Sequence, residues 1–164
     1  MKKLMLLALG SFLVLSSFAQ SNKEDIDMVQ AMYGKQKKEI ASEFINVPGS
    51  KKDAFWKLYD KYETERKAMG QKRISVLKKY ANAYDTLNAK STDGIIKQTI
   101  ALQKGTDGLI GKYYDLILKS IGAKPAAQFY QLESYMLSVT RVYIMSQIPF
   151  IGELQKSSTP PAQQ

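Results

Sequence analysis

The sequence contains no cysteine and no histidine. Without cysteine, the chain can form neither a disulfide bond nor a thiolate metal site, so its fold depends on packing alone. Without histidine, it lacks the commonest general base, the commonest metal ligand and the side chain that titrates near neutral pH. These two absences exclude soft zinc and copper(II) sites and remove most of the residues used in catalysis.

Other patterns that carry chemistry are also missing. No glycine-rich loop that could hold a phosphate precedes a Lys-Ser or Lys-Thr pair, so nothing indicates nucleotide use. The acidic pairs Asp25/Asp27 and Glu63/Glu65 are each two residues apart, and such pairs do not share a helical face. We find no nucleophile paired with a base. We therefore predict that the protein is not an enzyme and binds neither a cofactor nor a metal.

The first nineteen residues have the pattern of a signal peptide. Two lysines precede an apolar run over residues 4–18, and the small residues Ser17 and Ala19 stand at the −3 and −1 positions of a cleavage site. An uncleaved membrane anchor is the alternative, although the run is short for a span. We expect cleavage after Ala19, export to the periplasm, a single helical domain over residues 20–154 and a disordered tail over residues 155–164.

The chain carries a net charge of +9, and this charge is concentrated in one segment. Residues 51–90 contain eleven Lys or Arg and five Asp or Glu, a balance of +6. Such a balance in a cytosolic protein would suggest nucleic acid, but the export signal argues against that partner. The remaining acidic partners are acidic segments of envelope or non-native proteins and, more weakly, anionic lipid head groups.

Residues 51–90 also predict the longest helix, which we expect to begin after a Ser50 cap supported by Asp53 and to end near Leu87 or Ala89. Steps of four and three from Phe55 give a seven-residue repeat that keeps one stripe of a helix facing a partner. The stripe consists of Phe55, Tyr59, Tyr62, Arg66, Met69, Arg73, Val76, Tyr80, Ala83 and Leu87.

Three further helices are predicted, over about 24–46, 92–120 and 125–147, and no strand signal is present. The glycines between 105 and 108 leave open a break in the third of these helices, although the apolar spacing continues across them. We expect an all-α fold of four helices, one of them long, in an elongated antiparallel hairpin or bundle that could form a curved dimer.

Arg66 and Arg73 interrupt the apolar stripe and admit two interpretations. They could pair with carboxylates of a neighbouring helix, such as Glu39 or Glu43, while their stems pack. Alternatively, the stripe stays partly open as a basic and aromatic groove that contacts clients. The candidate client-binding residues are Tyr59, Tyr62, Arg66, Lys67, Met69, Lys72, Arg73, Lys78, Lys79 and Tyr80.

The predicted helix over 125–147 is apolar around most of its circumference, which indicates burial or an interface. It supplies the alternative function, a structural or regulatory module that docks one specific envelope partner. The candidate docking residues are Phe129, Met136, Tyr143, Phe150 and Ile151.

Two segments resemble the Spy/CpxP-like group of small periplasmic helical proteins, the LTXXQ-motif family. They are residues 55–63 (FWKLYDKYE) with the following Arg66, and residues 126–133 (AAQFYQLE). The resemblance spans most of residues 24–150. The chain departs from the family at its two loops, which read LNAKS at 87–91 and IGAKP at 121–125 where the family has Leu-Thr-x-x-Gln. We therefore identify it as a divergent member.

The resemblance implies an ATP-independent periplasmic chaperone or an envelope-stress accessory protein. It also implies a curved antiparallel homodimer with a basic concave face that carries apolar patches. Together with the basic, aromatic helix, it makes a chaperone-like protein that binds non-native proteins our leading hypothesis. The partner-docking module remains the alternative.

Overall fold

The computed structural model describes residues 36–148, and the fold in this range is all-α, as expected. It contains four α-helices: α2 (Lys37–Phe44), α3 (Lys52–Ala83), α4 (Ala89–Ser120) and α5 (Ala123–Gln147). Two short 3-10 helices, η2 (Gly49–Lys51) and η3 (Tyr84–Thr86), flank α3. The predicted signal peptide, residues 24–35 of the first predicted helix, the residues Phe150 and Ile151, and the tail lie outside the described residues. The prediction of one helix over about 24–46 is wrong within the described residues, because Gln36 is extended and α2 begins only at Lys37.

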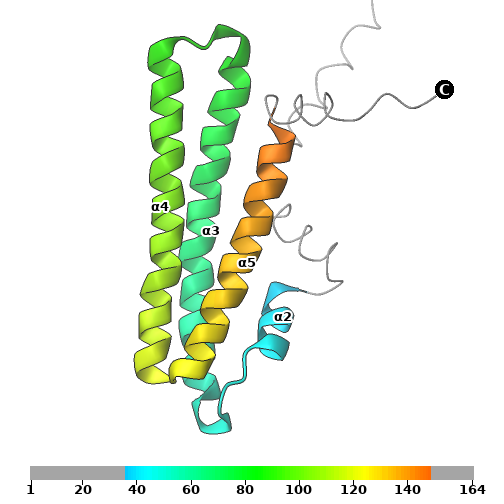
Figure 1. The fold of residues 1–164 in the computed structure, drawn as a ribbon, viewed down its shortest axis with the longest axis vertical. Helices are drawn as coiled ribbons and strands as arrows, with labels where there is room; N and C mark the ends of the chain where they lie inside the picture. Colours follow the sequence, from blue (N-terminus) through cyan, green and yellow to red (C-terminus); the bar gives the residue numbers. More distant parts are fainter. Residues whose placement is uncertain (1–35, 149–164) are drawn as a thin grey trace, which may run out of the picture.

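α3 and α4 form a long antiparallel hairpin (Figure 1). Each has 32 residues, and an α-helix rises about 1.5 Å per residue, so each is roughly 48 Å long. α5 packs along the lower part of this hairpin and leans away from it toward its own C-terminal end, and α2 lies against the lower part of α5 (Figure 1). No helix between residues 36 and 148 is long and apolar enough to cross a membrane.

The two ends of α3 differ from the prediction. Its first residue follows Lys51, which makes no side-chain capping hydrogen bond, so the predicted Ser50 cap is wrong. Ser50 instead lies inside η2. At the other end α3 stops at Ala83, several residues before the predicted Leu87 or Ala89.

The early end of α3 follows from the cap of the next helix. Asn88 adopts an extended conformation, and its side chain accepts a hydrogen bond from the Ser91 backbone N–H at 3.0 Å. The Ser91 hydroxyl in turn accepts from the Asn88 N–H at 3.0 Å, which completes a capping box. α4 therefore begins at Ala89, and the chain between Ala83 and Asn88 has to turn.

α4 continues without a break through Gly105 and Gly108, so the alternative of a split helix is wrong. At Gly105, α4 lies close to α3. A β-carbon added at Gly105 would lie 3.4 Å from the Met69 Cε. Gly122 separates α4 from α5 with a φ of 136°, a conformation that L-residues with side chains rarely adopt. Lys51 supports this turn by donating from Nζ to the Ile121 carbonyl at 2.9 Å.

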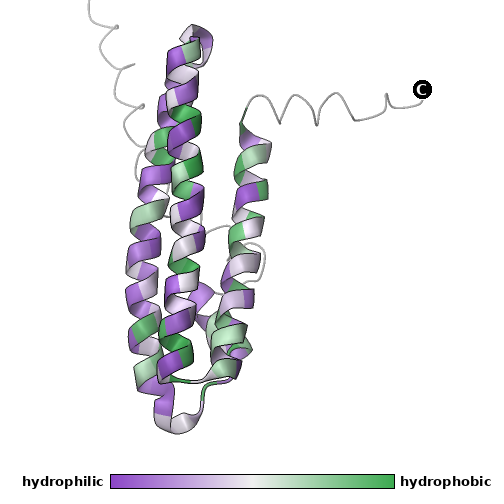
Figure 2. Ribbon diagram, turned by 60° about the vertical axis from the view of Figure 1, so that its left-hand side comes forward, coloured by the Kyte–Doolittle hydropathy of each residue, from purple (hydrophilic) through white to green (hydrophobic). Residues whose placement is uncertain are grey.

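The apolar core is concentrated where α2, α3, α4 and α5 all meet, at the lower end of the hairpin. Its members come from all four helices and from Ile45 and Ile121, which follow α2 and α4. Its larger members include Phe55, Tyr59, Tyr62, Ile110, Tyr113, Ile117, Phe129, Leu132 and Met136. Figure 2 shows that hydrophobic residues recur along the helices among hydrophilic ones.

The seven-residue stripe of α3 faces its neighbours along the whole helix. Phe55, Tyr59 and Tyr62 are fully buried. From Arg66 onward the stripe is half-buried, except for Val76, which is buried at 8% exposure. The spacing therefore predicted the buried face correctly, and the degree of burial falls as α3 leaves the core.

Candidate functional site

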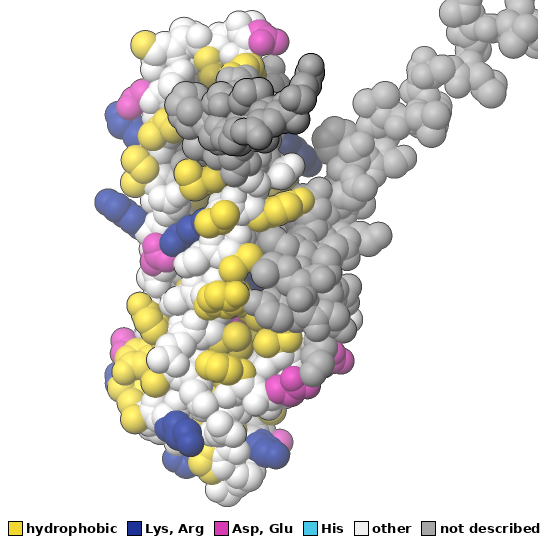
Figure 3. All heavy atoms as spheres, turned by 45° about the vertical axis from the view of Figure 1, so that its right-hand side comes forward, with side chains coloured by type: hydrophobic (Ala, Val, Ile, Leu, Met, Phe, Trp, Pro, Cys, Tyr) yellow, Lys and Arg dark blue, Asp and Glu magenta, His cyan; other side chains and the backbone are white. Residues whose placement is uncertain are grey.

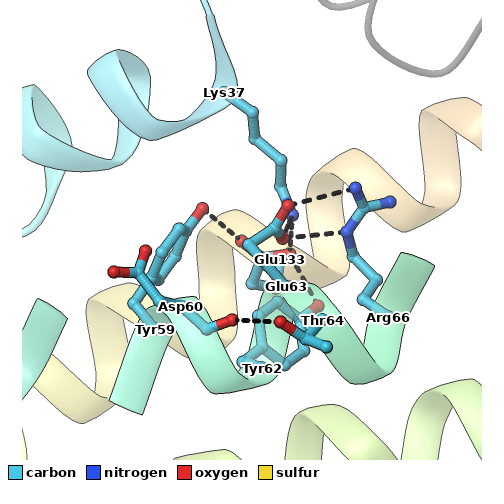
Figure 4. Close-up of polar contacts among 8 residues, drawn as sticks. All are labelled: Lys37, Tyr59, Asp60, Tyr62, Glu63, Thr64, Arg66 and Glu133. Atoms are coloured by element: carbon cyan, nitrogen blue, oxygen red, sulfur yellow. Dashed lines mark hydrogen bonds and ion pairs between the residues drawn. The ribbon is translucent and has the colours of Figure 1, made fainter. Parts of the chain in front are cut away.

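A buried carboxylate, Glu133, lies at the point where α2, α3 and α5 meet. Its side chain is 2% exposed. It accepts hydrogen bonds from the Tyr59 hydroxyl at 3.1 Å and the Tyr62 hydroxyl at 2.7 Å. Lys37, reaching down from α2, donates to the same carboxylate at 2.6 Å (Figure 4). Both oxygens of Glu133 are thus satisfied, as a buried charge requires.

A second carboxylate, Glu63, extends this network on α3. It accepts from Lys37 Nζ at 2.6 Å, so that one ammonium group bridges two carboxylates. Arg66 donates two hydrogen bonds to Glu63, from Nε at 2.8 Å and from a terminal nitrogen at 3.1 Å. We call Lys37, Tyr59, Tyr62, Glu63, Arg66 and Glu133 the Glu133 cluster. Its two cations and two carboxylates balance in charge.

The local sequence explains how the tyrosines reach Glu133. Tyr59 and Tyr62 stand at stripe positions of α3, so both side chains point inward. Phe129 precedes Glu133 by one helical turn, and its ring packs edge-on against Tyr59 and Tyr62, with centroids 6.3 Å and 5.0 Å apart. The aromatic rings therefore form an apolar layer that holds the two hydroxyl groups under the carboxylate.

The surroundings of Glu63, Tyr59 and Tyr62 shift the pKa values of these three side chains. Burial by itself would raise the pKa of Glu63, but Lys37 and Arg66 outweigh it and hold that pKa at about 2. Burial, together with the nearby Glu133 carboxylate, raises the pKa of the Tyr59 and Tyr62 hydroxyls. At neutral pH the tyrosines are therefore fixed hydrogen-bond donors. The arrangement is suited to holding three helices together.

The depressed pKa of Glu63 makes stability depend on acid pH. A carboxylate whose pKa falls on folding, here from 4.5 to about 2, stabilises the fold above its unfolded pKa and loses that contribution as the pH falls. We expect this group to contribute about 3 kcal/mol of unfolding free energy, lost between about pH 5 and about pH 2. Urea unfolding measured across this range should show a shallower pH slope for Glu63→Gln than for the parent chain.

The matched control for that measurement is Asp115→Asn, which removes an exposed carboxylate of α4. Its pH slope should equal that of the parent chain. An equal slope for Glu63→Gln as well would contradict the assignment of the acid sensitivity to the Glu133 cluster.

A cavity of about 240 Å³ adjoins the Glu133 cluster where α3 and α5 begin to separate. Its wall mixes cationic side chains with apolar ones, and Gln36 and Lys37 close one side. The other principal lining residues are Arg66, Lys67, Met69, Arg73, Met136, Leu137 and Thr140. Arg66, Met69 and Arg73 are members of the seven-residue stripe of α3. The cavity therefore lies beside the half-buried part of that stripe.

The candidate client-binding residues divide into three groups by exposure. Tyr59 and Tyr62 are fully buried and bonded to Glu133, so a client cannot contact them in this structure; assigning them to the client surface was wrong. The half-buried members of the set are Arg66, Met69, Arg73 and Tyr80. The exposed members are Lys67, Lys72, Lys78 and Lys79.

Arg66 is ion-paired, but its partner differs from those considered. It pairs with Glu63 on its own helix, rather than with Glu39 or Glu43 of the neighbouring segment. Of the docking candidates, Phe129 and Met136 are buried in the core and are therefore not available to a partner. Tyr143 is exposed, and Phe150 and Ile151 lie outside the described residues.

Sequence reasoning missed Lys37 and Glu133 as members of a site. Glu133 had a usable signal, because it is one of only two charged residues between Pro125 and Gly152 on an otherwise apolar helix. A lone charge on such a helix indicates a buried partner. Lys37 had no such signal, since it stands in a run of lysines that all look solvent-exposed.

The α4 side of the hairpin has its own polar network. Glu65 accepts from the Tyr113 hydroxyl at 2.8 Å and from Lys112 Nζ at 2.9 Å and 2.8 Å. Burial and this bond to Glu65 raise the pKa of Tyr113 to about 12. Glu63 and Glu65 thus face different helices, as their spacing predicted.

No group of three potential metal-ligating side chains occurs in the part of the chain that the structure describes. No protein-family model, curated protein or solved structure matches this chain.

Proposed function

We propose that this chain is an exported, chaperone-like protein that captures non-native proteins on the upper half of the α3–α4 hairpin. One observation carries the proposal. Four lysines of α3 (Lys67, Lys72, Lys78 and Lys79) are exposed along the part of the helix that lies beyond the core. Together they form a positive surface, which attracts acidic segments over long range.

Exposed apolar side chains accompany these lysines. The antiparallel pairing of α3 with α4, seen in the Glu65–Lys112 ion pair, places the first half of α4 beside the second half of α3. There Ile96 is 51% exposed and Ile100 is 45% exposed. Exposed apolar groups beside cations supply both attraction and a contact that excludes water.

The resemblance to the Spy/CpxP-like family supports the same proposal, because its members present basic concave surfaces with apolar patches. We extend the proposal on that basis to periplasmic localisation, a role in envelope stress and assembly as a homodimer.

The test measures how well the mature chain suppresses aggregation of an unfolding acidic protein at low and high salt. We expect suppression that weakens with salt, because exposed charges are screened. Replacing the four exposed lysines with Gln should slow capture at low salt by about tenfold, the lower end of electrostatic steering effects.

The matched control removes the same charge elsewhere, with Lys52, Lys57, Lys61 and Lys119 replaced by Gln. These lysines are also exposed but lie near the core end of the hairpin. This variant should capture clients nearly as fast as the parent chain. If the folded parent chain suppresses aggregation at neither the low nor the high salt concentration, the proposal is refuted.

One observation favours the alternative, a module that docks a single envelope partner. The second half of α5 exposes Val142 (68%), Tyr143 (46%) and Met145 (49%). Figure 3 shows exposed hydrophobic side chains over much of the face that it presents. Under this alternative, the parent chain pulls down one stoichiometric partner. The double variant Val142→Glu/Tyr143→Glu should lose that partner and should still suppress aggregation as the parent chain does.

A third function, peripheral binding to anionic membranes, would use the same four lysines. Failure of the mature chain to bind anionic vesicles at low salt would remove it.

A further inference from the structure

The second half of α5 is held to the hairpin less tightly than the first half. The first half is anchored in the core through Phe129, Leu132 and Glu133, all of which are buried. Thr140 is the last buried residue of α5, and residues 141–148 are half-buried or exposed. Elements with few buried contacts open at a low free-energy cost, so this half of α5 is the part of the helix best suited to move.

The cavity beside the Glu133 cluster weakens the packing of α5 further. Met136, Leu137 and Thr140 of α5 contribute to its wall, as does Met69 of α3. A void leaves the side chains that line it without partner atoms on one side. α5 accordingly packs more extensively against α4 than against α3.

One ion pair ties the second half of α5 to α4. A terminal nitrogen of Arg141 donates to both carboxylate oxygens of Asp107, at 2.8 Å and 2.9 Å. Arg141 is the only charged residue of α5 beyond Glu133, so every ion pair of this half must involve it. The Asp107 side chain is 56% exposed, and an exposed ion pair changes an equilibrium constant by no more than about fivefold.

A hinge position lies between the two halves of α5. The Ser138 hydroxyl donates to the Ser134 carbonyl at 2.9 Å, and such a bond within a helix weakens it slightly and often bends it. Residues 134–138 directly follow Glu133, which is held by its three hydrogen-bond donors. Figure 1 shows α5 leaning away from the hairpin toward its C-terminal end.

The α4 face that carries Asp107 continues as part of the proposed client surface. Ile100 precedes Asp107 by seven residues and Ile96 precedes Ile100 by four, so the three side chains share one face of α4. Ile96 and Ile100 are both exposed. Movement of the second half of α5 away from Asp107 would extend this apolar surface to the lining of the cavity.

We propose that residues 138–147, the α5 flap, turn about the hinge at 134–138, and that the Arg141–Asp107 ion pair controls whether the flap covers the cavity. Opening exposes Met69, Met136 and Leu137 to an apolar side chain of a non-native protein. The assignment of the uncovered surface to clients rests on the proposed function, whereas the hinged movement does not. The α5 flap thereby regulates how much apolar surface the hairpin offers.

The absence of native cysteine allows the movement to be measured with spin labels in the mature chain. One labelled pair, Ala101→Cys with Gln147→Cys, joins α4 to the end of the α5 flap. A second pair, Ser120→Cys with Ala127→Cys, joins the same two helices at the core end. All four positions are exposed. We expect a short and a longer distance for the first pair and one narrow distance for the second. A single narrow distance for each pair would overturn the proposal.

Asp107→Asn tests the role of the ion pair. It should raise the ratio of longer to short distances in the first labelled pair by up to about fivefold. The matched control is Asp93→Asn, which breaks the exposed ion pair with Lys97 on the same helix and should leave the ratio unchanged. Equal ratios in the two variants would overturn the role of the Arg141–Asp107 ion pair. A longer distance that also appears in the second labelled pair would indicate general loosening, which contradicts a hinge.

Locking the α5 flap tests its link to clients. A short bismaleimide linker joins the two cysteines of the first pair, and the control is the same variant with both cysteines blocked by N-ethylmaleimide. The locked chain should lose part of its suppression of aggregation. Equal suppression by the two forms would overturn the role of the α5 flap in client capture. If the parent chain itself suppresses nothing, the proposed function is refuted, and the distance measurements still decide whether the hinge exists.

Discussion

Replacing Glu133 with alanine is expected to lower the free energy of unfolding by about 3–5 kcal/mol, the cost of breaking a buried ion pair by removing one partner. Three donors converge on this carboxylate: Lys37, Tyr59 and Tyr62. Removing it leaves two buried hydroxyl groups without their acceptor, and each such loss costs about 1–3 kcal/mol. Lys37 keeps Glu63 as a partner, which limits the total loss.

Urea unfolding of Glu133→Ala and Glu133→Gln measures this effect. The Gln variant retains an acceptor oxygen but not the charge, so its loss should fall between those of the parent and Glu133→Ala. Asp115→Ala serves as the control, with a change within about 0.5 kcal/mol for an exposed site. A Glu133→Ala variant as stable as the parent would show that the Glu133 cluster contributes nothing net to folding.

Phe129→Ala is expected to cost a similar amount, about 3–5 kcal/mol, because truncating a buried phenylalanine removes apolar contacts and leaves a cavity. Phe129 is 0% exposed and touches the rings of both Tyr59 and Tyr62. Its loss should also loosen the two tyrosines, so near-ultraviolet circular dichroism should weaken along with stability.

Phe44→Ala provides the comparison for Phe129→Ala, since it makes the same substitution on α2 at a side chain that is 43% exposed. We expect it to cost less than about 1 kcal/mol. Equal losses for the two variants would mean that the core does not depend on the contact between α5 and the tyrosines.

α3 and α4 could be predicted from the sequence because each carries a periodic apolar face long enough to outweigh local signals. The spacing continued through Gly105, and α4 indeed continues there. Helix ends were less predictable, since several residues compete for each cap. Asn88 and Ser91 together make a reciprocal pair of hydrogen bonds, and this pair shifted the start of α4 and the end of α3.

The site was predictable only in part. The stripe showed that Tyr59, Tyr62 and Arg66 face inward, but it could not show which groups they meet. Glu133 lies 71 residues beyond Tyr62, and Lys37 lies 96 residues before Glu133. Contacts over such separations depend on how whole helices pack, which single-sequence periodicity does not specify.

The concentration of the core at one end of the hairpin implies that resistance to opening is graded along the molecule. Near Phe55 and Ile117, breaking a backbone hydrogen bond requires separating several packed helices. Near Tyr80 and Ile96, within the described residues, the hairpin tip has only half-buried or exposed side chains. Amide protons at the tip should therefore exchange with solvent through small local openings, while those at the base exchange only through global unfolding.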